Sequence, residues 1–196
     1  NLSDSLLMVV NENKYGFVNL MDTMVVPMEY DYAGIAIEFK NGYAIADRNT
    51  KHGMVNRTGN FIYSKEFNKI LPFSEGLAQV EKKGKWGFAD HKLKEVIKSQ
   101  YEWVGPFENG MAKARKKGLY GFIDMKGKIV IPFIYEDMED FKSNLCKVTL
   151  DGMLGYIDRN GKEVIAPQWD DITNLSEDLL KVERDKHIAY YNLRLQ

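Results

Sequence analysis

Few side chains in this sequence carry reactive chemistry, and their spacing argues against a shared metal or catalytic centre. The histidines are His52, His91 and His187, and neighbours in this series are 39 or more residues apart. A metal site needs clustered ligands, so no metal site is predicted. The single cysteine, Cys146, falls at a repeat position that is mostly small and apolar. We expect it to be a buried hydrophobic residue, because a reactive thiolate needs an accessible, electropositive setting.

Acidic residues recur at two kinds of position, and calcium binding is the chemistry that they could support. The first set opens turns: Asp90, Asp124 and Asp158. The second set follows an aromatic residue: Asp31, Glu102, Glu136 and Asp170. An Asp that opens a turn accepts a hydrogen bond from the backbone two residues on, which accounts for the first set. For the second set we expect hydrogen bonds to backbone at the sheet ends. Structural calcium is the alternative, although the calcium-binding β-helix repeat is absent.

No motif for nucleophilic catalysis or for a cofactor is present. The chain has no G-x-S-x-G segment, no phosphate loop and no dinucleotide fingerprint. We therefore expect no enzyme, no catalytic residues and no cofactor. A net charge of −1 predicts no nucleic-acid partner, and no apolar stretch is long enough for a membrane span. One cysteine permits no internal disulfide, so the cytoplasm, the cell envelope and secretion are not distinguished.

A glycine-centred segment recurs along the chain, from KYGFVN at Lys14 to MLGYID at Met153, with a decayed last copy, HIAYYN, at His187. Its central residues are Gly16, Gly53, Gly87, Gly121, Gly155 and Ala189. The first interval is 37 residues and the other four are 34. This periodicity indicates a tandem array. The expected units are residues 3–39, 40–73, 74–107, 108–141, 142–175 and a partial unit, 176–196.

A period of 34 residues also fits pairs of helices, but the composition of each unit favours strands. The apolar runs are short and rich in strand formers, as in GLAQV and KIVIP. A helix pair would need two longer runs with 3.6-residue periodicity and without Gly or Pro. The predicted fold class is therefore all-β, a tandem array of three-stranded meanders. The stretch that crosses to the next unit, such as QYEWVGPFENG, could include a short helical turn.

Side chains along the expected strand KWGFAD alternate between two faces, and this explains why the central residue is glycine. Trp86 and Phe88 point to one face, whereas Gly87 and Ala89 point to the other. Small residues let another strand approach closely, and Trp86 is expected to pack against neighbouring copies. One meander cannot bury its own apolar face, so adjacent units must stack. The array is expected to be solenoid-like or a curved ribbon, with a closed propeller-like ring as the alternative.

These residues resemble the WG repeat, also called KWG, a β-rich bacterial module. The resemblance rests on KWGFAD, LYGFID and MLGYID, on the D-x-x-G-K turns that follow, and on FSEGLA from Phe73 to Ala78. It covers nearly the whole chain. Trp is retained only at Trp86, which indicates a diverged array. The resemblance implies no catalytic activity, and interaction is the role that it suggests.

Protein binding is the function that the pattern favours, because a repeat array keeps its core positions and varies its surface. Large residues that break their repeat positions are the candidate contacts: Trp103, Tyr32 and Phe133. The alternative is carbohydrate or cell-envelope binding. The aromatic series from Tyr30 to Trp169 could then form a ladder that stacks on sugar rings. An enzyme is the least favoured of the three hypotheses.

Overall fold

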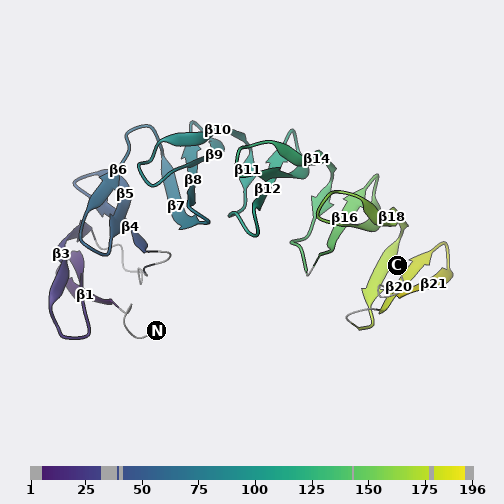
Figure 1. Cartoon of the computed structure of the whole chain (residues 1–196), viewed down its shortest axis with the longest axis horizontal. Helices are drawn as coiled ribbons and strands as arrows, with labels where there is room; N and C mark the ends of the chain where they lie inside the picture. Colours follow the sequence, from purple (N-terminus) through teal and green to yellow (C-terminus); the bar gives the residue numbers. More distant parts are fainter. Residues whose placement is uncertain (1–5, 32–38, 40–41, 143, 177–178, 193–196) are drawn as a thin grey trace. The chain divides into compact units, whose positions relative to one another are not determined.

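The chain is built entirely from short β-strands in the residues that the computed structural model describes, namely 6–31, 39, 42–142, 144–176 and 179–192. The chain divides into two compact units, unit 1 from Asn1 to Gly110 and unit 2 from Met111 to Gln196. Consecutive strands pair in antiparallel fashion into small open sheets (Figure 1). The predicted all-β tandem array is confirmed.

Unit 1 contains three sheets and one further short strand. The first sheet has β1 (Leu7–Asn11), β2 (Lys14–Val18) and β3 (Met24–Asp31). The second has β4 (Tyr43–Arg48), β5 (Lys51–Asn56) and β6 (Phe61–Tyr63). The third has β7 (Lys69–Ser74), β8 (Leu77–Lys82), β9 (Lys85–Ala89) and β10 (Glu95–Tyr101), after which comes β11 (Trp103–Val104).

Unit 2 repeats the same pattern. Its first strands are β12 (Met111–Lys116), β13 (Leu119–Asp124) and β14 (Ile129–Tyr135). The next sheet has β15 (Asp137–Met138), β16 (Cys146–Leu150), β17 (Met153–Ile157) and β18 (Glu163–Trp169). The last has β19 (Asp171–Asn174), β20 (Leu179–Arg184) and β21 (His187–Asn192).

The stretch that crosses between repeats is a short strand in the described residues, so the expectation of a helical turn is wrong. β7 pairs with β8, β15 pairs with β16, and β19 pairs with β20. Each crossing strand satisfies backbone groups along the first strand of the following meander. These three pairings tie the repeats that β7, β15 and β19 connect.

Both turns of the meander have the backbone conformation and hydrogen bonds that their sequences predict. In the hairpin between β8 and β9, Lys83 and Gly84 have φ angles of 53° and 75°, the left-handed pair of a two-residue turn. In the D-x-x-G-K turn between β13 and β14, Asp124 Oδ1 accepts hydrogen bonds from the N–H groups of Lys126 and Lys128, at 2.9 and 2.8 Å. Gly127 takes a φ of 78° there.

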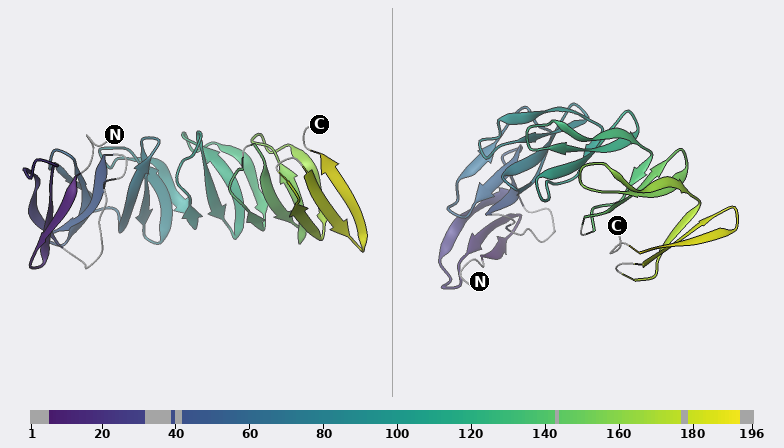
Figure 2. Two further views of the ribbon diagram at one scale, coloured as in Figure 1. Left: turned by 90° about the horizontal axis from the view of Figure 1, so that it is seen from below. Right: turned by 45° about the vertical axis from the view of Figure 1, so that its right-hand side comes forward.

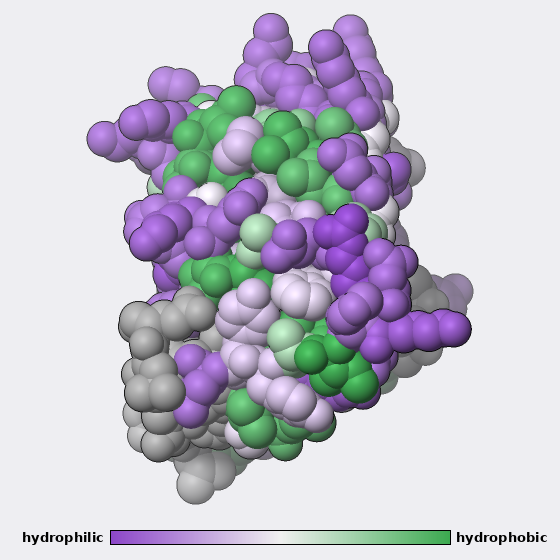
Figure 3. All heavy atoms as spheres, turned by 90° about the vertical axis from the view of Figure 1, so that its right-hand side faces the viewer, coloured by the Kyte–Doolittle hydropathy of each residue, from purple (hydrophilic) through white to green (hydrophobic). Residues whose placement is uncertain are grey.

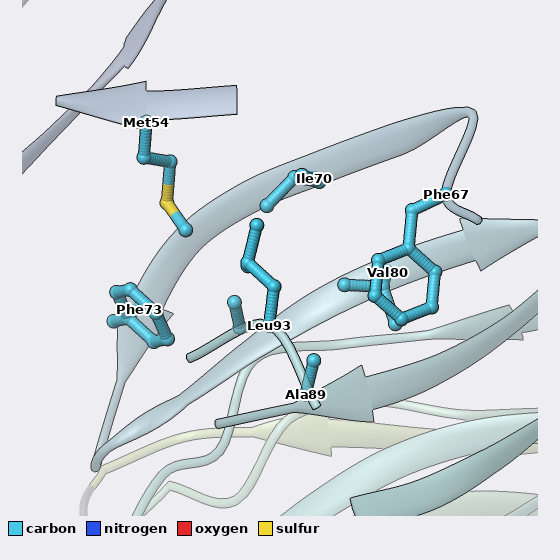
Figure 4. Close-up of a cluster of buried hydrophobic side chains, with 8 residues drawn as sticks. Met54, Phe67, Ile70, Phe73, Val80, Ala89 and Leu93 are labelled. Carbon is cyan, nitrogen blue, oxygen red and sulfur yellow. The ribbon is translucent and has the colours of Figure 1, made fainter. Parts of the chain in front are cut away.

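The core lies between successive sheets, as stacking requires. In unit 1, Met54 of β5 packs against residues of the next sheet, among them Ile70, Phe73 and Val80 (Figure 4). In unit 2, Phe122 of β13 packs in one cluster with Cys146 and Val148 of β16. The hairpins within a unit therefore stand side by side, and each covers its neighbour's apolar face (Figure 2).

The central glycines face a backbone that leaves no room for a side chain. A Cβ on Gly87 would lie 2.4 Å from the carbonyl oxygen of Ile97 on β10, the third strand of the meander β8–β9–β10. The equivalent contacts at the other four glycines run from 2.2 to 2.6 Å, at Gly16, Gly53, Gly121 and Gly155. The register between β9 and β10 shifts at this point, because a bulge brings the third strand over the glycine.

Candidate binding surface

The one thiol has no setting for nucleophilic chemistry. Cys146 is buried, and its Sγ donates to the carbonyl oxygens of Glu139 and Lys147, at 3.2 and 3.5 Å. Burial raises the pKa of this thiol to about 12, so it stays protonated at neutral pH. Among the described residues, no three His, Cys, Asp or Glu side chains group into a metal-binding cluster.

The turn-opening acids, and Glu136 and Asp170 of the second set, act as backbone caps, whereas Asp31 pairs with the ammonium group of Lys14. Asp90 and Asp158 accept two backbone N–H bonds each, in the same way as Asp124. In the second set, Glu136 accepts from the N–H of Gly152 at 3.0 Å, and Asp170 accepts from that of Asp185 at 3.0 Å. These bonds join each carboxylate to the hairpin turn of the next meander. They give the acids a structural role that does not require calcium.

The aromatic series that could form a sugar-stacking ladder is largely inside the core. Tyr30, Phe67, Tyr101 and Tyr135 are all buried, and Trp169 is half-buried. Each side chain lies near the end of, or just after, a third strand, where it turns inward towards the stacked sheets. The prediction that this series presents a ladder is wrong, because a buried ring has no free face for a sugar.

The structure places two of the three predicted contact residues, and they lie in different units. Trp103 on β11 in unit 1 is 41% exposed. Phe133 on β14 in unit 2 is half-buried. Tyr32 lies outside the described residues. The structure therefore does not bring the three together into one site.

Phe133 lies on a strand that carries further solvent-accessible apolar residues, which the sequence comparison did not reveal. On β14, Ile131 and Tyr135 are buried and hold the strand against the core, whereas Ile129 and Ile134 are 50% and 43% exposed. Met125, in the turn before the strand, is also exposed. We call Met125, Ile129, Phe133 and Ile134 the β14 strip.

The equivalent strand β10 shows that the fold does not demand these apolar residues. On β10, Glu95, Ser99 and Gln100 occupy the positions of Ile129, Phe133 and Ile134. Glu95 Oε1 accepts hydrogen bonds there from the N–H and the hydroxyl of Ser99, at 2.8 and 2.6 Å. The strand thus forms equally well with a polar outer surface. Comparison of the repeats position by position is the signal that would have identified Ile134, because its equivalents are Glu29, Glu66, Gln100 and Gln168.

A positive charge borders the strip at the turn. The backbone N–H groups of Lys126 and Lys128 cap Asp124, which fixes the turn. Neither ammonium group forms an ion pair with a carboxylate in the part of the chain that is described. The strip therefore combines exposed aliphatic side chains with cations that are available to a partner.

Comparisons with known proteins agree with the tandem arrangement. A family model described as the WG containing repeat matches residues 15–51, 53–86, 86–120, 120–153 and 155–186. No curated protein matches the chain. No helix capable of crossing a bilayer occurs among the residues described.

Two solved structures illustrate the similarity found at low identity. Hsv2 of Kluyveromyces lactis is 10% identical, with a TM-score of 0.48 over 98% of this chain and 71% of that one. BamB from Moraxella catarrhalis is 11% identical, with a TM-score of 0.45 over 96% of this chain and 70% of that one.

Proposed function

The chain belongs to the WG-containing repeat family, and from that premise we propose that it is a non-catalytic module that binds a protein partner through the β14 strip. The observation that carries the proposal is the exposure of Ile134 at a repeat position that is otherwise polar (Glu29, Glu66, Gln100 and Gln168), together with the exposure of Ile129 on the same strand. Exposed apolar surface that is bordered by polar or charged residues often marks a protein–protein interaction site.

A non-catalytic role is supported by what the reactive groups do. Cys146 is buried and protonated, and Glu136 and Asp170 accept hydrogen bonds from backbone N–H groups of hairpin turns. The His52 ring lies beside Asp47, its cross-strand neighbour, with Nδ1 and Oδ1 2.6 Å apart. Each of these groups is accounted for by the fold or by strand pairing.

The chain itself supplies a substitution that tests the proposal without disturbing the strand. The triple variant Ile129→Glu, Phe133→Ser and Ile134→Gln gives β14 the residues that β10 already has at these positions. The Glu and Ser should form the same hydrogen bonds as Glu95 and Ser99. We expect the variant to fold like the native chain and to lose the apolar anchors.

The measurement is affinity capture from a lysate of the source organism, followed by quantitative mass spectrometry, with native and variant chains side by side. A partner held by the strip should bind the triple variant about thirtyfold more weakly, a loss of about 2 kcal/mol. Val96→Lys on β10, another exposed aliphatic residue, is the matched control and should retain the partner. Equal recovery by the native chain and the triple variant would refute the role of β14.

A further inference from the structure

The two ends of β14 carry charges of opposite sign, and this arrangement bears on what the β14 strip binds. Lys126 and Lys128 precede the strand, and Glu136 and Asp137 follow it. All four side chains are exposed. None of them forms an ion pair with another residue that the structure describes. The strand therefore has an apolar middle between a basic end and an acidic end.

The register of β14 on β13 places both exposed isoleucines on one face of the sheet. Ile131 lies opposite Phe122, whereas Ile129 lies opposite the next residue of β13. Neighbouring residues on β13 point to opposite faces, so the bulge between these two pairs turns Ile129 away from the face of Ile131. Ile134 directly precedes Tyr135, which is buried in one cluster with Ile131. The alternation of side chains thus puts Ile134 on the same face as Ile129.

β14 is also an edge strand, so a second strand can approach it from the side. Within the described residues it pairs with β13 alone, at the end of the sheet order β11-β12-β13-β14. Pro132 has no N–H group and interrupts a hydrogen-bonded ladder at the middle of this edge. A contact along β14 therefore relies on its side chains more than on its backbone.

The order of these side chains is self-complementary when two copies of β14 run antiparallel. A two-fold axis through the centre of the strand places Ile129 of one copy opposite Ile134 of the other. The same axis places Lys126 of one copy opposite Asp137 of the other, because both pairs are centred on the same point of the sequence. The apolar residues then meet each other, and each lysine meets an acid.

The equivalent strands have charged ends without the apolar middle. On β10, Glu95 and Gln100 take the positions of the two isoleucines, and on β18 these positions hold Glu163 and Gln168. Two antiparallel copies of either strand would bring carboxylates and amides together, which are costly to remove from water. The residues therefore favour β14 over β10 and β18 as a contact between two chains.

Exposed apolar atoms alone do not identify this contact. On the face that Figure 3 shows, groups of green hydrophobic atoms are separated by purple and pale ones. Scattered apolar groups of that kind are common on protein surfaces. The contact at β14 is distinguished by its pattern, in which two isoleucines on one face lie between charges of opposite sign.

We propose that the partner of the β14 strip is a second copy of this chain, in a symmetric dimer with the two β14 strands antiparallel. The inference rests on the proposed function of the strip and names the partner. Ile129 and Ile134 form the apolar contact, and Lys126 and Asp137 form an ion pair on either side of it. Each copy uses the same surface, so the assembly closes at two chains.

Sedimentation velocity of the native chain between about 5 and 500 μM tests the dimer. The chain should pass from one copy to two as its concentration rises, and no larger species should form. Ile134→Gln introduces the residue that β10 has at this position, so the fold should be kept. Dimerisation should weaken by about thirtyfold or more, because the two-fold axis removes the side chain twice. Val96→Lys is the matched control and should dimerise like the native chain.

A pair of charge reversals tests the antiparallel arrangement. Lys126→Glu sets two acids against each other at both ion pairs, and Asp137→Lys sets two lysines against each other. Each variant alone should therefore dimerise about tenfold more weakly than the native chain. An equimolar mixture should regain the native affinity, because one chain of each kind restores opposite charges at both ion pairs.

Circular dichroism and urea denaturation should show that all these variants keep the native fold, since the substituted side chains are exposed. Sedimentation of the native chain as a single copy at all concentrations would overturn the second copy as the partner. A mixture of the charge variants that dimerises no better than either variant alone would overturn it as well. The proposed function would survive both results if capture from the lysate recovered a different protein that the triple variant loses. Equal recovery in that capture, by contrast, counts against the strip itself.

Discussion

At the scale of single residues, the central glycines are required by space and not by backbone conformation. Gly87 has no positive φ angle, in contrast to the turn residue Gly84. The constraint at Gly87 is the carbonyl group of Ile97, which would lie 2.4 Å from a Cβ. Because that group belongs to the backbone of a paired strand, it cannot rotate away as a side chain would.

We predict that Gly87→Ala lowers the free energy of unfolding by about 3 kcal/mol, the upper end of the cost of overpacking. The added methyl group must push β10 away from β9 or break the pairing between them. Urea denaturation followed by circular dichroism measures the change. Gly84→Ala is the matched control. A Cβ there meets no atom within 4 Å, so only the left-handed backbone opposes it, at a cost of about 1 kcal/mol. Equal losses in the two variants would contradict the argument from close approach.

At the scale of elements, the backbone of each D-x-x-G turn lowers the pKa of the Asp that opens it. The backbone N–H of Lys94, with that of Lys92, lowers the pKa of Asp90. The N–H groups of Lys162 and Asn160 act in the same way on Asp158. Because the pKa is lower in the folded chain than in the unfolded one, each ionised carboxylate stabilises the fold above about pH 4. That contribution is lost as the pH falls through the folded pKa.

We therefore predict that the double variant Asp90→Asn and Asp158→Asn has a flatter dependence of stability on pH below about pH 4 than the native chain. Asn keeps the acceptor oxygen, as Asn56 shows by accepting from the N–H groups of Thr58 and Asn60. Stability at pH 7 should therefore change little. The urea midpoint measured at pH 7, 4 and 2.5 reports both effects. The prediction fails if the double variant loses as much stability in acid as the native chain does.

Particular elements also show which parts of the fold could be predicted from the sequence and which could not. The repeat, the two turns and the place of Cys146 follow from spacing and residue type, because those patterns are local. The sugar ladder was a wrong expectation because the inward direction of Tyr101 and its equivalents depends on the bulge that precedes it. The crossing strand β7 was missed because its register is set by a partner, β8, and not by its own composition. Ile129 was missed because Met24 and Phe61 are apolar at the same repeat position, so that only its exposure distinguishes it from a core residue.

At the scale of the whole molecule, stability is shared between neighbours and does not come from one central core. The buried clusters each draw on adjacent sheets, as with Met54 and Ile70 in unit 1, or Tyr156 and Leu180 in unit 2. In such an array, the loss of one junction weakens the two sheets that meet there and leaves distant sheets intact. The chain should thus have regions that open independently.

We predict that Leu180→Ala lowers the local stability of the last sheet by about 3 kcal/mol, because it leaves a cavity beneath Tyr156. Hydrogen exchange, followed by mass spectrometry, should show faster exchange in β20 and β21 and unchanged exchange in β8 and β9. Leu7→Ala makes the same truncation at the same repeat position where the side chain is 54% exposed, so it should cost less than about 0.5 kcal/mol. Faster exchange in every sheet of the Leu180 variant would mean that the repeats unfold as one cooperative body. Stacking between neighbours would then be insufficient to explain how the array is held together.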